Sequence, residues 1–401
     1  MMSVSLAMWR NWSFITLFYA YQYIVRVLPN IIYKPIVETF GINATIFGQF
    51  SGIYYIGYAL AHIPVSLLFD RFGLKKVLPL TLLLMVGGLL PIIYTESWIY
   101  PVFGRFLTGI GSASVTLAAF HIIRVGFPVA KHPMMLSLTI ALGLVGAVYG
   151  GRPTAYLCDQ LGHVAVIQIL VAVGSIISVI SYISLPKEKN RLKDVQILKG
   201  LKHVFCNKNT MWMSLTAGLM IGSLEGFPDA WGVMFFTKVY GLQFDYSAQL
   251  TSLIFLGLGV GGPLVSYAAE KTGKALWFII IAGICMAVPF LFFLGMQLSD
   301  TMLIVSLITI GVGCSYQMLS IYHASYFVEK KYATISTAVV NMILMGFGHL
   351  LHSAIGCTVN ISGGLDNVQA LKNGLYVVPL ASLLGAIILI IRRKYFQNLK
   401  S

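Results

Sequence analysis

Long apolar runs recur along the whole of the 401-residue chain, and only short polar stretches separate them. Each run has about 20 residues, the length that a helix needs to cross the hydrocarbon core of a bilayer. The pattern predicts an all-α integral membrane protein with twelve transmembrane helices. The predicted spans are 11–33, 47–69, 77–95, 98–122, 134–157, 163–185, 211–237, 246–268, 275–297, 302–326, 333–358 and 374–391.

The composition agrees with this prediction, since 58% of the residues are hydrophobic and 10% are charged. The first run is too long for a secretory signal and lacks a cleavage pattern, so we expect it in the mature protein.

The net charge of +14 could indicate a nucleic-acid partner, but the basic residues are distributed according to membrane topology. If the N-terminus is cytoplasmic, 21 of the 27 basic residues fall in cytoplasmic segments, as the positive-inside rule requires. We therefore expect a cell (inner) membrane protein with both termini cytoplasmic and no nucleic-acid partner.

The chain divides into two halves that share a repeat. A charged stretch at 186–210 separates six spans in 1–185 from six in 211–401, and we interpret it as a cytoplasmic linker. The segment "SLLFDRFGLKK" begins at Ser66, and "SYAAEKTGKA" begins 200 positions later at Ser266. A second match, Gly109 and Gly111 with Gly311 and Gly313, has an offset of 202. Repeats at equivalent places indicate two bundles of one ancestral design.

The first repeated segment is a loop in which an acidic and a basic residue precede a glycine. The acid can accept hydrogen bonds at a helix N-terminus, and the glycine permits a tight turn. Such a loop could latch two helices in one conformation, or it could be an ordinary positive-inside loop. The residues of this predicted conformational latch are Asp70, Arg71 and Gly73 in the first half and Glu270, Lys271 and Gly273 in the second.

These motifs resemble those of the major facilitator superfamily. Its signature after the second span, G-x-x-x-D-R-x-G-R-R/K, is matched by Asp70, Arg71 and Gly73, although Ser66 replaces the first glycine and Leu74 replaces a basic residue. The span-four pattern R-x-x-x-G-x-G begins at Arg105. The resemblance implies a fold of two six-helix bundles and a secondary transporter that works by alternating access.

Ionisable residues at membrane depth are costly, so each should face a cavity or a partner. In the first span Tyr19, Gln22, Tyr23 and Arg26 are spaced i, i+3, i+4 and i+7 and form one polar stripe on a helix. We expect this stripe to bind substrate, with Arg26 facing the substrate or a carboxylate. The alternative is that Arg26 extends its charge to the membrane surface.

Further polar side chains of the first half are candidates for the same site. Tyr54 and Tyr58 lie one helical turn apart in the second span and could bind substrate or serve packing. Arg105 could bind an anion or form a structural ion pair. Arg152 follows the small-residue run "GLVGAVYGGRP", which resembles the span-five motif of the antiporters, except that Ala147 replaces a proline.

In the second half, span seven reads "GSLEGFPDAWG". Glu225 and Asp229 would lie one turn apart on one helix face, and Gly226 and Pro228 between them could break the helix. Two carboxylates in a poorly solvated site tend to share a proton, which suits a proton-coupled carrier. Alternatively, each pairs with an arginine of the first half. Trp231 could contact substrate or pack between helices.

The remaining candidates lie in spans ten and eleven. Gln317 is a buried amide that could bind solute or bridge helices. His349 and His352 stand three residues apart and could relay protons or form a polar helix contact. We include Gln317 and His349 among the substrate-binding candidates.

The sequence thus predicts a proton-coupled symporter of a small polar solute. Arginines in one half and carboxylates in the other favour an amino acid or small peptide, whereas uniport or efflux of an organic anion, nucleoside or drug is the alternative. The segment "FYAYQYIVRVLPN" also resembles the first span of the phagosomal nutrient transporters. No ATP-binding loop, nucleophile–base pair or metal-ligand spacing appears in the sequence, so we expect no enzyme activity, cofactor or metal. We expect a monomer in the lipid bilayer.

Overall fold

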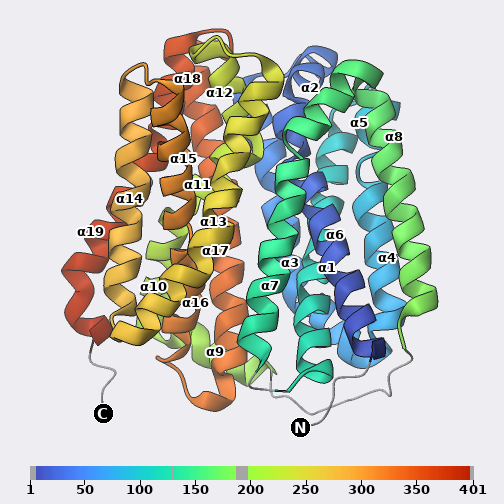
Figure 1. The fold of residues 1–401 in the computed structure, drawn as a ribbon, viewed down its shortest axis with the longest axis vertical. Coiled ribbons are helices and arrows are strands. Elements are labelled where there is room, and N and C mark those ends of the chain that lie inside the picture. Colours follow the sequence, from blue (N-terminus) through green and yellow to red (C-terminus); the bar gives the residue numbers. More distant parts are fainter. Residues whose placement is uncertain (1–5, 129–130, 187–196, 398–401) are drawn as a thin grey trace. The chain divides into compact units, whose positions relative to one another are not determined.

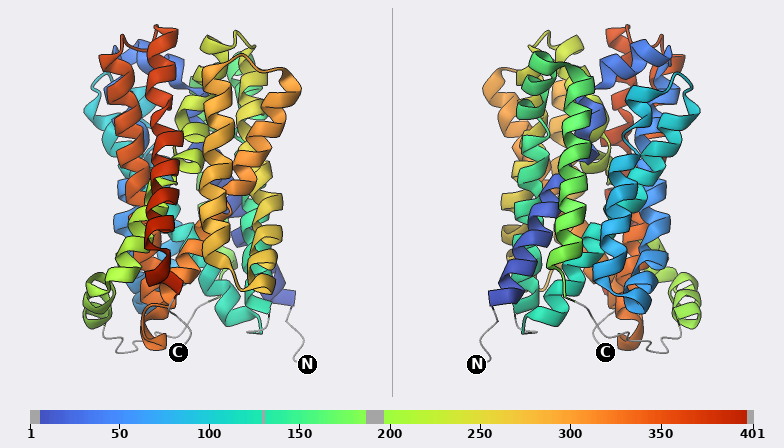
Figure 2. Two further views of the ribbon diagram at one scale, coloured as in Figure 1. Left: turned by 90° about the vertical axis from the view of Figure 1, so that its left-hand side faces the viewer. Right: turned by 90° about the vertical axis from the view of Figure 1, so that its right-hand side faces the viewer.

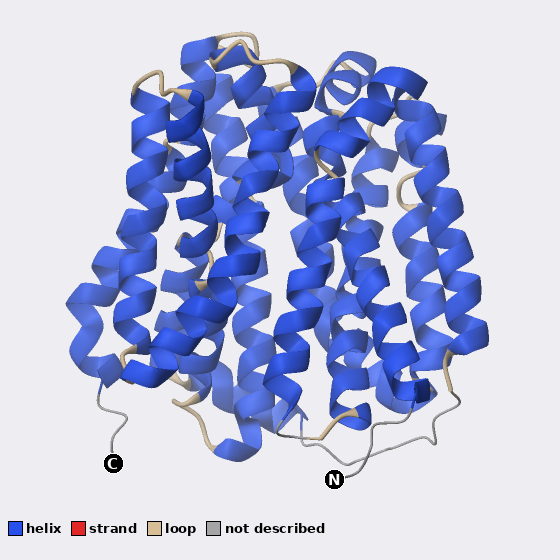
Figure 3. Cartoon of the chain, in the orientation of Figure 1, coloured by secondary structure: helices blue, strands red, loops and turns tan. Residues whose placement is uncertain are grey.

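The computed structural model describes residues 6–128, 131–186 and 197–397. Within these ranges the chain consists of helices and their connections, without a strand, as Figure 3 shows. Packing divides the chain into two compact units. Unit 1 comprises 1–41 and 53–193, and unit 2 comprises 42–52 and 194–401. The first part of the predicted linker, 187–196, lies outside the described residues.

The helices of the first half are labelled in Figure 1. Their bounds are α1 (Leu6–Ile31), α2 (Tyr33–Phe40), α3 (Ala44–Phe72), α4 (Leu74–Gly87), α5 (Pro91–Tyr94), α6 (Ile99–Gly126), α7 (His132–Tyr149) and α8 (Arg152–Ser184). Helix α3 begins within the segment 42–52 that groups with unit 2, and its remainder belongs to unit 1. Helix α8 contains a kink at Gly162, which separates the predicted fifth and sixth spans.

The helices of the second half begin with α9 (Ile197–Cys206), which Figure 2 shows as a short yellow-green helix. The others are α10 (Lys208–Leu219), α11 (Gly222–Glu225), η2 (Phe227–Trp231), α12 (Gly232–Val239), α13 (Phe244–Thr272), α14 (Ala275–Gly295), α15 (Asp300–Gly313), α16 (Tyr316–Ser325), η3 (Lys330–Tyr332), α17 (Ala333–Ile361), α18 (Val368–Leu375) and α19 (Val377–Gln397). Val204 of α9 packs against Val339 of α17, so this part of the predicted linker is folded onto unit 2.

Each of the twelve predicted apolar runs falls on a helix or on consecutive helices. Nine helical stretches of the described chain are long and apolar enough to cross a membrane, and one of them, Met134–Ser184, covers two predicted spans. The predicted spans outside these nine stretches are 11–33 and 211–237. These two carry Arg26 and the pair Glu225 and Asp229, so the spans that depart most from an apolar helix hold the candidate chemistry.

Glycines set the helix packing in the same way in both units. In unit 1 a Cβ on Gly109 of α6 would overlap the Tyr54 carbonyl of α3. In unit 2 a Cβ on Gly311 of α15 would overlap the Ile254 carbonyl of α13, and Tyr54 and Ile254 are themselves 200 positions apart. The repeated glycines therefore allow two equivalent helix pairs to approach until their backbones touch.

Each loop of the predicted latch contains a glycine with a positive φ. Gly73 has φ 81° and Gly273 has φ 64°, a region that strains any residue with a Cβ. Beyond the first loop, Lys75 donates to the Leu185 carbonyl at 2.9 Å, and so a cation neutralises the C-terminal end of α8. Asp70, Arg71, Glu270 and Lys271 are all exposed. The two glycines explain why the chain can turn at these loops. The latch role of the loops stays a prediction.

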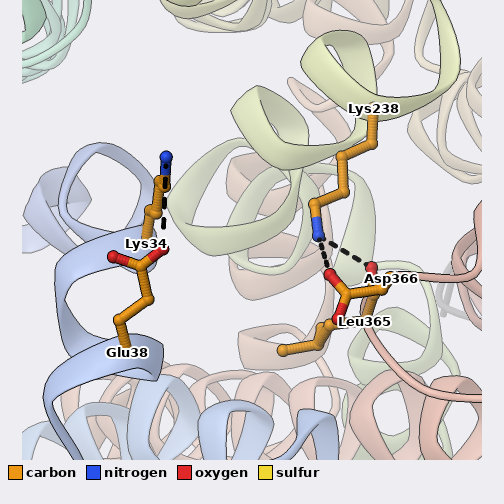
Figure 4. A network of polar contacts seen from close by, with 5 residues as sticks. All are labelled: Lys34, Glu38, Lys238, Leu365 and Asp366. Carbon is orange, nitrogen blue, oxygen red and sulfur yellow. Dashed lines mark hydrogen bonds and ion pairs between the residues drawn. The ribbon is translucent and has the colours of Figure 1, made fainter.

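Two ion pairs near helix ends are drawn in Figure 4. In unit 1, Lys34 and Glu38 of α2 stand 4.0 Å apart. In unit 2, Lys238 at the end of α12 donates to Asp366 at 2.9 Å and to the Leu365 carbonyl at 3.0 Å. The hydrogen bond from Lys238 lowers the pKa of Asp366 below its usual range.

We predict that a methyl group at either repeated glycine destabilises the protein. Gly109→Ala and Gly311→Ala force the facing carbonyls apart, which should cost about 1–3 kcal/mol. Gly87 and Gly346 are helical glycines with open space where an alanine Cβ would lie, so alanine there should be neutral or stabilising by up to about 1 kcal/mol. Thermal melting of the purified protein measures all four. Equal melting temperatures for Gly109→Ala and Gly87→Ala would contradict the packing argument.

The Lys238–Asp366 pair should contribute little and should do so only when Asp366 is ionised. Because its pKa is lowered in the folded state, the contribution is present above the unfolded-state pKa and is lost as pH falls through the folded-state pKa. Asp366 is exposed, so Asp366→Asn should lower the melting temperature by less than about 2 °C at neutral pH. Melting curves of both proteins should converge in acid. A difference that grows on acidification would show that the contact acts by another means.

Candidate functional site

Unit 1 holds a buried group of aromatic, amide and guanidinium side chains, which we call the arginine–tyrosine cluster. Helix α1 contributes Tyr19, Gln22, Tyr23 and Arg26, α3 contributes Tyr54, Tyr55 and Tyr58, and α6 contributes Arg105. None of these residues is more than 8% exposed. The cluster brings together the predicted stripe of the first span, both predicted tyrosines of the second span and the arginine of the fourth.

Arg26 lies between two aromatic faces. Its guanidinium carbon is 5.1 Å from the Tyr23 ring centre and 5.5 Å from the Tyr55 ring centre. Cation–π contacts stabilise a guanidinium where water is excluded, at about 2 kcal/mol for a desolvated pair. This position favours a stripe that faces the interior of the unit over an arginine that extends toward the membrane surface.

Hydrogen bonds hold the tyrosines of α3 in place. Gln22 donates through Nε2 to the Tyr54 hydroxyl at 2.6 Å, which joins α1 to α3. The Tyr58 hydroxyl is 2.9 Å from the Thr116 hydroxyl of α6. One turn further, His62 Nδ1 lies 3.1 Å from the Tyr58 carbonyl. The polar stripe of α3 is therefore fixed by both neighbouring helices.

Arg105 binds the backbone of α1 where a proline interrupts it. Pro29 has no N–H, so the carbonyl of Val25, four residues earlier, lacks its usual helical donor. Arg105 donates to the Val25 carbonyl at 3.3 Å and to the Arg26 carbonyl at 2.7 Å. Its guanidinium also lies 4.6 Å from the Tyr54 ring centre. Arg105 thus fixes the part of α1 that carries Arg26, whereas the sequence pattern had indicated only an anion or an ion-pair partner for it.

Arg152 occupies a different position from the cluster residues. It is exposed and begins α8, directly after the break at Gly150 and Gly151. The glycines before it serve helix packing, since a Cβ on Gly146 would overlap the Ala20 carbonyl of α1. The antiporter-like run therefore brings α7 close to α1.

The carboxylates of unit 2 lie on a broken helix. Helix α11 ends at Glu225, Gly226 adopts φ −110° and ψ −75°, and the π-helical η2 runs from Phe227 to Trp231. The break that Gly226 and Pro228 were predicted to allow is present, so the regular helical spacing does not apply between Glu225 and Asp229. Both carboxylates are 2% exposed. Their burial within this segment keeps them candidates for proton binding.

Phenylalanines support η2 from one side. The Phe227 ring stands 5.2 Å from Phe290 and 5.9 Å from Phe235, both edge to face. Phe236 and Phe293 complete the group, with centroid distances of 5.8 and 5.7 Å to Phe227. Such aromatic packing anchors the start of η2 firmly.

Trp231, at the end of η2, donates a hydrogen bond from its indole nitrogen to another residue of the protein. The indole is fully buried, and its Nε1 donates to Nδ1 of His352 at 3.0 Å. Its ring meets Phe47 of the segment 42–52 edge to face at 5.3 Å. His349, one turn before His352 on α17, is half-buried, and Gln317 on α16 is buried.

A family model for the Major Facilitator Superfamily matches residues 13–351. The chain belongs to the major facilitator superfamily. The predicted resemblance and the all-α fold of twelve transmembrane helices in two six-helix bundles are thereby confirmed. The family and the relatives are membrane transporters and not enzymes, so this protein binds a solute and moves it across the membrane without a chemical reaction. In the described residues no group of histidine, cysteine and acidic side chains could hold a metal ion.

Individual relatives agree on the family and differ in their named substrates. The chain is 25% identical to the uncharacterized transporter YybO of Bacillus subtilis, over 73% of this chain and 72% of that protein. It is 23% identical to a putative tartrate transporter of Agrobacterium vitis, over 91% and 90%. A crystal structure of a bacterial homologue of the human lysosomal transporter Spinster has a TM-score of 0.68 and 16% identity, over 98% of this chain and 97% of that one, and shares the fold.

We predict that Arg105 and Pro29 are energetically coupled. Arg105→Lys loses the planar fork that serves two carbonyls and should lower stability by about 1.5–3 kcal/mol. Pro29→Ala restores a donor for the Val25 carbonyl, so Arg105→Lys should cost less in that background. Melting temperatures of the wild type, both single variants and the double variant form the cycle. Strictly additive effects would show that Arg105 does not compensate for Pro29.

Proposed function

We propose that this protein is a secondary transporter that carries a small polar solute across the membrane by alternating access with proton symport. An amino acid or small peptide is the favoured solute class. The observation that carries the proposal is the separation of buried charge, with Arg26 and Arg105 in unit 1 and Glu225 and Asp229 in unit 2. A solute with both a carboxylate and an ammonium group suits this distribution.

Arg26 is the group we assign to a substrate carboxylate. It is buried against two aromatic faces, and a guanidinium in such a place can form strong bidentate hydrogen bonds with a carboxylate. Arg105 is engaged with the backbone of α1, and we assign it the positioning of Arg26. Tyr19, Gln22, Tyr23, Tyr54 and Tyr58 supply the surrounding aromatic and hydrogen-bonding surface.

Glu225 and Asp229 are the groups we assign to the proton. A buried carboxylate is costly when ionised, so proton binding and solute binding can depend on each other there. The break at Gly226 lets the two carboxylates change position without distorting a continuous helix. Trp231, Gln317, His349 and Arg152 keep their proposed substrate roles, and the loops at Asp70 and Glu270 keep their proposed latch role.

Organic-anion transport is the second candidate. The relative from Agrobacterium vitis is named a putative tartrate transporter, and a dicarboxylate would use the arginines without needing the carboxylates of unit 2. We place the protein in the cell (inner) membrane as a monomer with both termini cytoplasmic. We also retain functional halves of 1–185 and 211–401 joined by the linker 186–210.

Uptake into proteoliposomes tests the proposal. Pools of radiolabelled amino acids, dipeptides and hydroxy-dicarboxylates are offered with and without an inward proton gradient. For an amino acid or dipeptide, the gradient should stimulate uptake, and Glu225→Gln should reduce that stimulation at least about tenfold, a difference of about 1.4 kcal/mol. Asp366→Asn removes an exposed carboxylate of the same unit and should leave uptake unchanged.

Other outcomes decide between the candidates. The organic-anion function would be favoured if the protein took up dicarboxylates only, and if this uptake fell in Arg26→Gln but persisted in Glu225→Gln. Uptake that ignores both the gradient and Glu225→Gln would contradict proton symport and indicate facilitated diffusion.

A further inference from the structure

The hydrogen bond between Trp231 and His352 fixes the protonation state of a buried histidine. An indole nitrogen can only donate, so His352 Nδ1 must accept with its lone pair. The ring proton of His352 then resides on Nε2, and the imidazole is neutral. A second proton would occupy Nδ1 and place two N–H groups against each other. This contact and a charged His352 are therefore mutually exclusive.

The same hydrogen bond joins the broken helix to α17. Trp231 is the last residue of η2, two positions after Asp229, and His352 lies in the second half of α17. The start of η2 is anchored by the phenylalanines around Phe227, whereas its end is held by the bond to His352 and the ring contact with Phe47. Loss of the bond would free the C-terminal end of η2, which follows Asp229 by two residues.

Residues 42–52 pack on α17 at the same place. A Cβ on Gly48 would overlap the His352 carbonyl, and a Cβ on Gly356 would overlap the Ala44 carbonyl. Thr45 donates to the Gly356 carbonyl at 3.5 Å. The backbone around His352 is thus closely packed, and the contact that a change in its protonation removes directly is the hydrogen bond from Trp231.

We propose that His352 is a positioning residue that senses protons and controls η2. When neutral, it accepts from Trp231 and holds η2 in place, and proton uptake at Nδ1 releases Trp231. The proposal rests on the proton symport proposed above and adds a protonation site distinct from Glu225 and Asp229. It gives the transporter a means to couple a proton to the position of its carboxylate segment.

The surroundings of His352 contain both signs of charge. Helix α17 itself carries His349, and the residues 42–52 carry no titratable side chain. The charged groups on the elements packed nearest are Glu225 of α11, Asp229 of η2 and Lys372 of α18. The basic groups of α9 lie at the start of α17, where His203 stacks on Tyr332.

Indole fluorescence reads the contact without requiring transport. The chain has 6 tryptophans, so the Trp231 signal is the emission of the full-length protein minus that of Trp231→Phe. It is followed from about pH 4.5 to about pH 8, the range in which histidines titrate. His352→Gln retains an acceptor at every pH, and His352→Leu has none. The matched control is His163→Gln, a half-buried histidine of unit 1.

We expect the Trp231 signal of the wild type and of His163→Gln to titrate between two levels. His352→Gln should stay at the high-pH level and His352→Leu at the low-pH level. A titration that persists in His352→Leu, or a flat wild-type signal in protein that circular dichroism shows to be folded, would overturn the proposal.

Transport then separates this inference from the proposed function. Proton-driven uptake whose pH profile is the same in His352→Gln as in the wild type would overturn the role of His352 while leaving the symporter intact. A Trp231 signal that titrates through His352 in a protein with no proton-driven uptake would leave the switch standing and remove the symport proposal.

Discussion

The membrane interior offers no water to a backbone N–H or carbonyl group, so each interruption of a spanning helix needs a compensating partner inside the protein. Pro29 removes a donor from α1, and the guanidinium of Arg105 supplies one to the Val25 carbonyl. Gly226 interrupts span seven, and its N–H still donates to the Gly222 carbonyl at 3.1 Å. The candidate chemistry lies at these two interruptions. At the first interruption, the side chain that satisfies the backbone also fixes the helix segment that carries Arg26.

The two units share a scaffold but not its chemistry. The glycine contacts of Gly109 and Gly311 place equivalent helix pairs in contact. At the repeat offsets, however, Tyr54 corresponds to Ile254 and Arg105 to Leu307, and both replacements are buried apolar residues. These two positions, on the second and fourth spans, therefore have apolar counterparts in unit 2, whereas the acids lie on span seven, the counterpart of the span that carries Arg26. Buried charges of opposite sign therefore occur on equivalent spans of the two units.

The sequence was sufficient for the features that depend on local pattern. Apolar length predicted the twelve spans, spacing predicted the stripe from Tyr19 to Arg26, and Gly73 and Gly273 predicted tight turns. Contacts between residues far apart in the chain could not be predicted from the sequence. Nothing in the residues near Arg105 indicates that its acceptors lie 80 and 79 positions away on a helix with a proline. The partner of Trp231 is likewise 121 positions away. Gly226 and Pro228 indicated a break between Glu225 and Asp229, but the backbone angles of Gly226 and the π-helix that follows could not be predicted from periodicity.

A short broken segment suits a carrier because it confines the movement to few residues. The phenylalanines beneath Phe227 bury large apolar surfaces, which hold one end of η2 by many small contacts that do not respond to a proton. The other end is held by the buried Trp231 ring with its Phe47 contact and by a hydrogen bond, which contributes about 1 kcal/mol net and is lost when its acceptor is protonated. The two ends of the segment therefore differ in what can release them. In the proposed switch, a proton on His352 therefore removes a contact at Trp231 and leaves the packing around Phe227 unchanged.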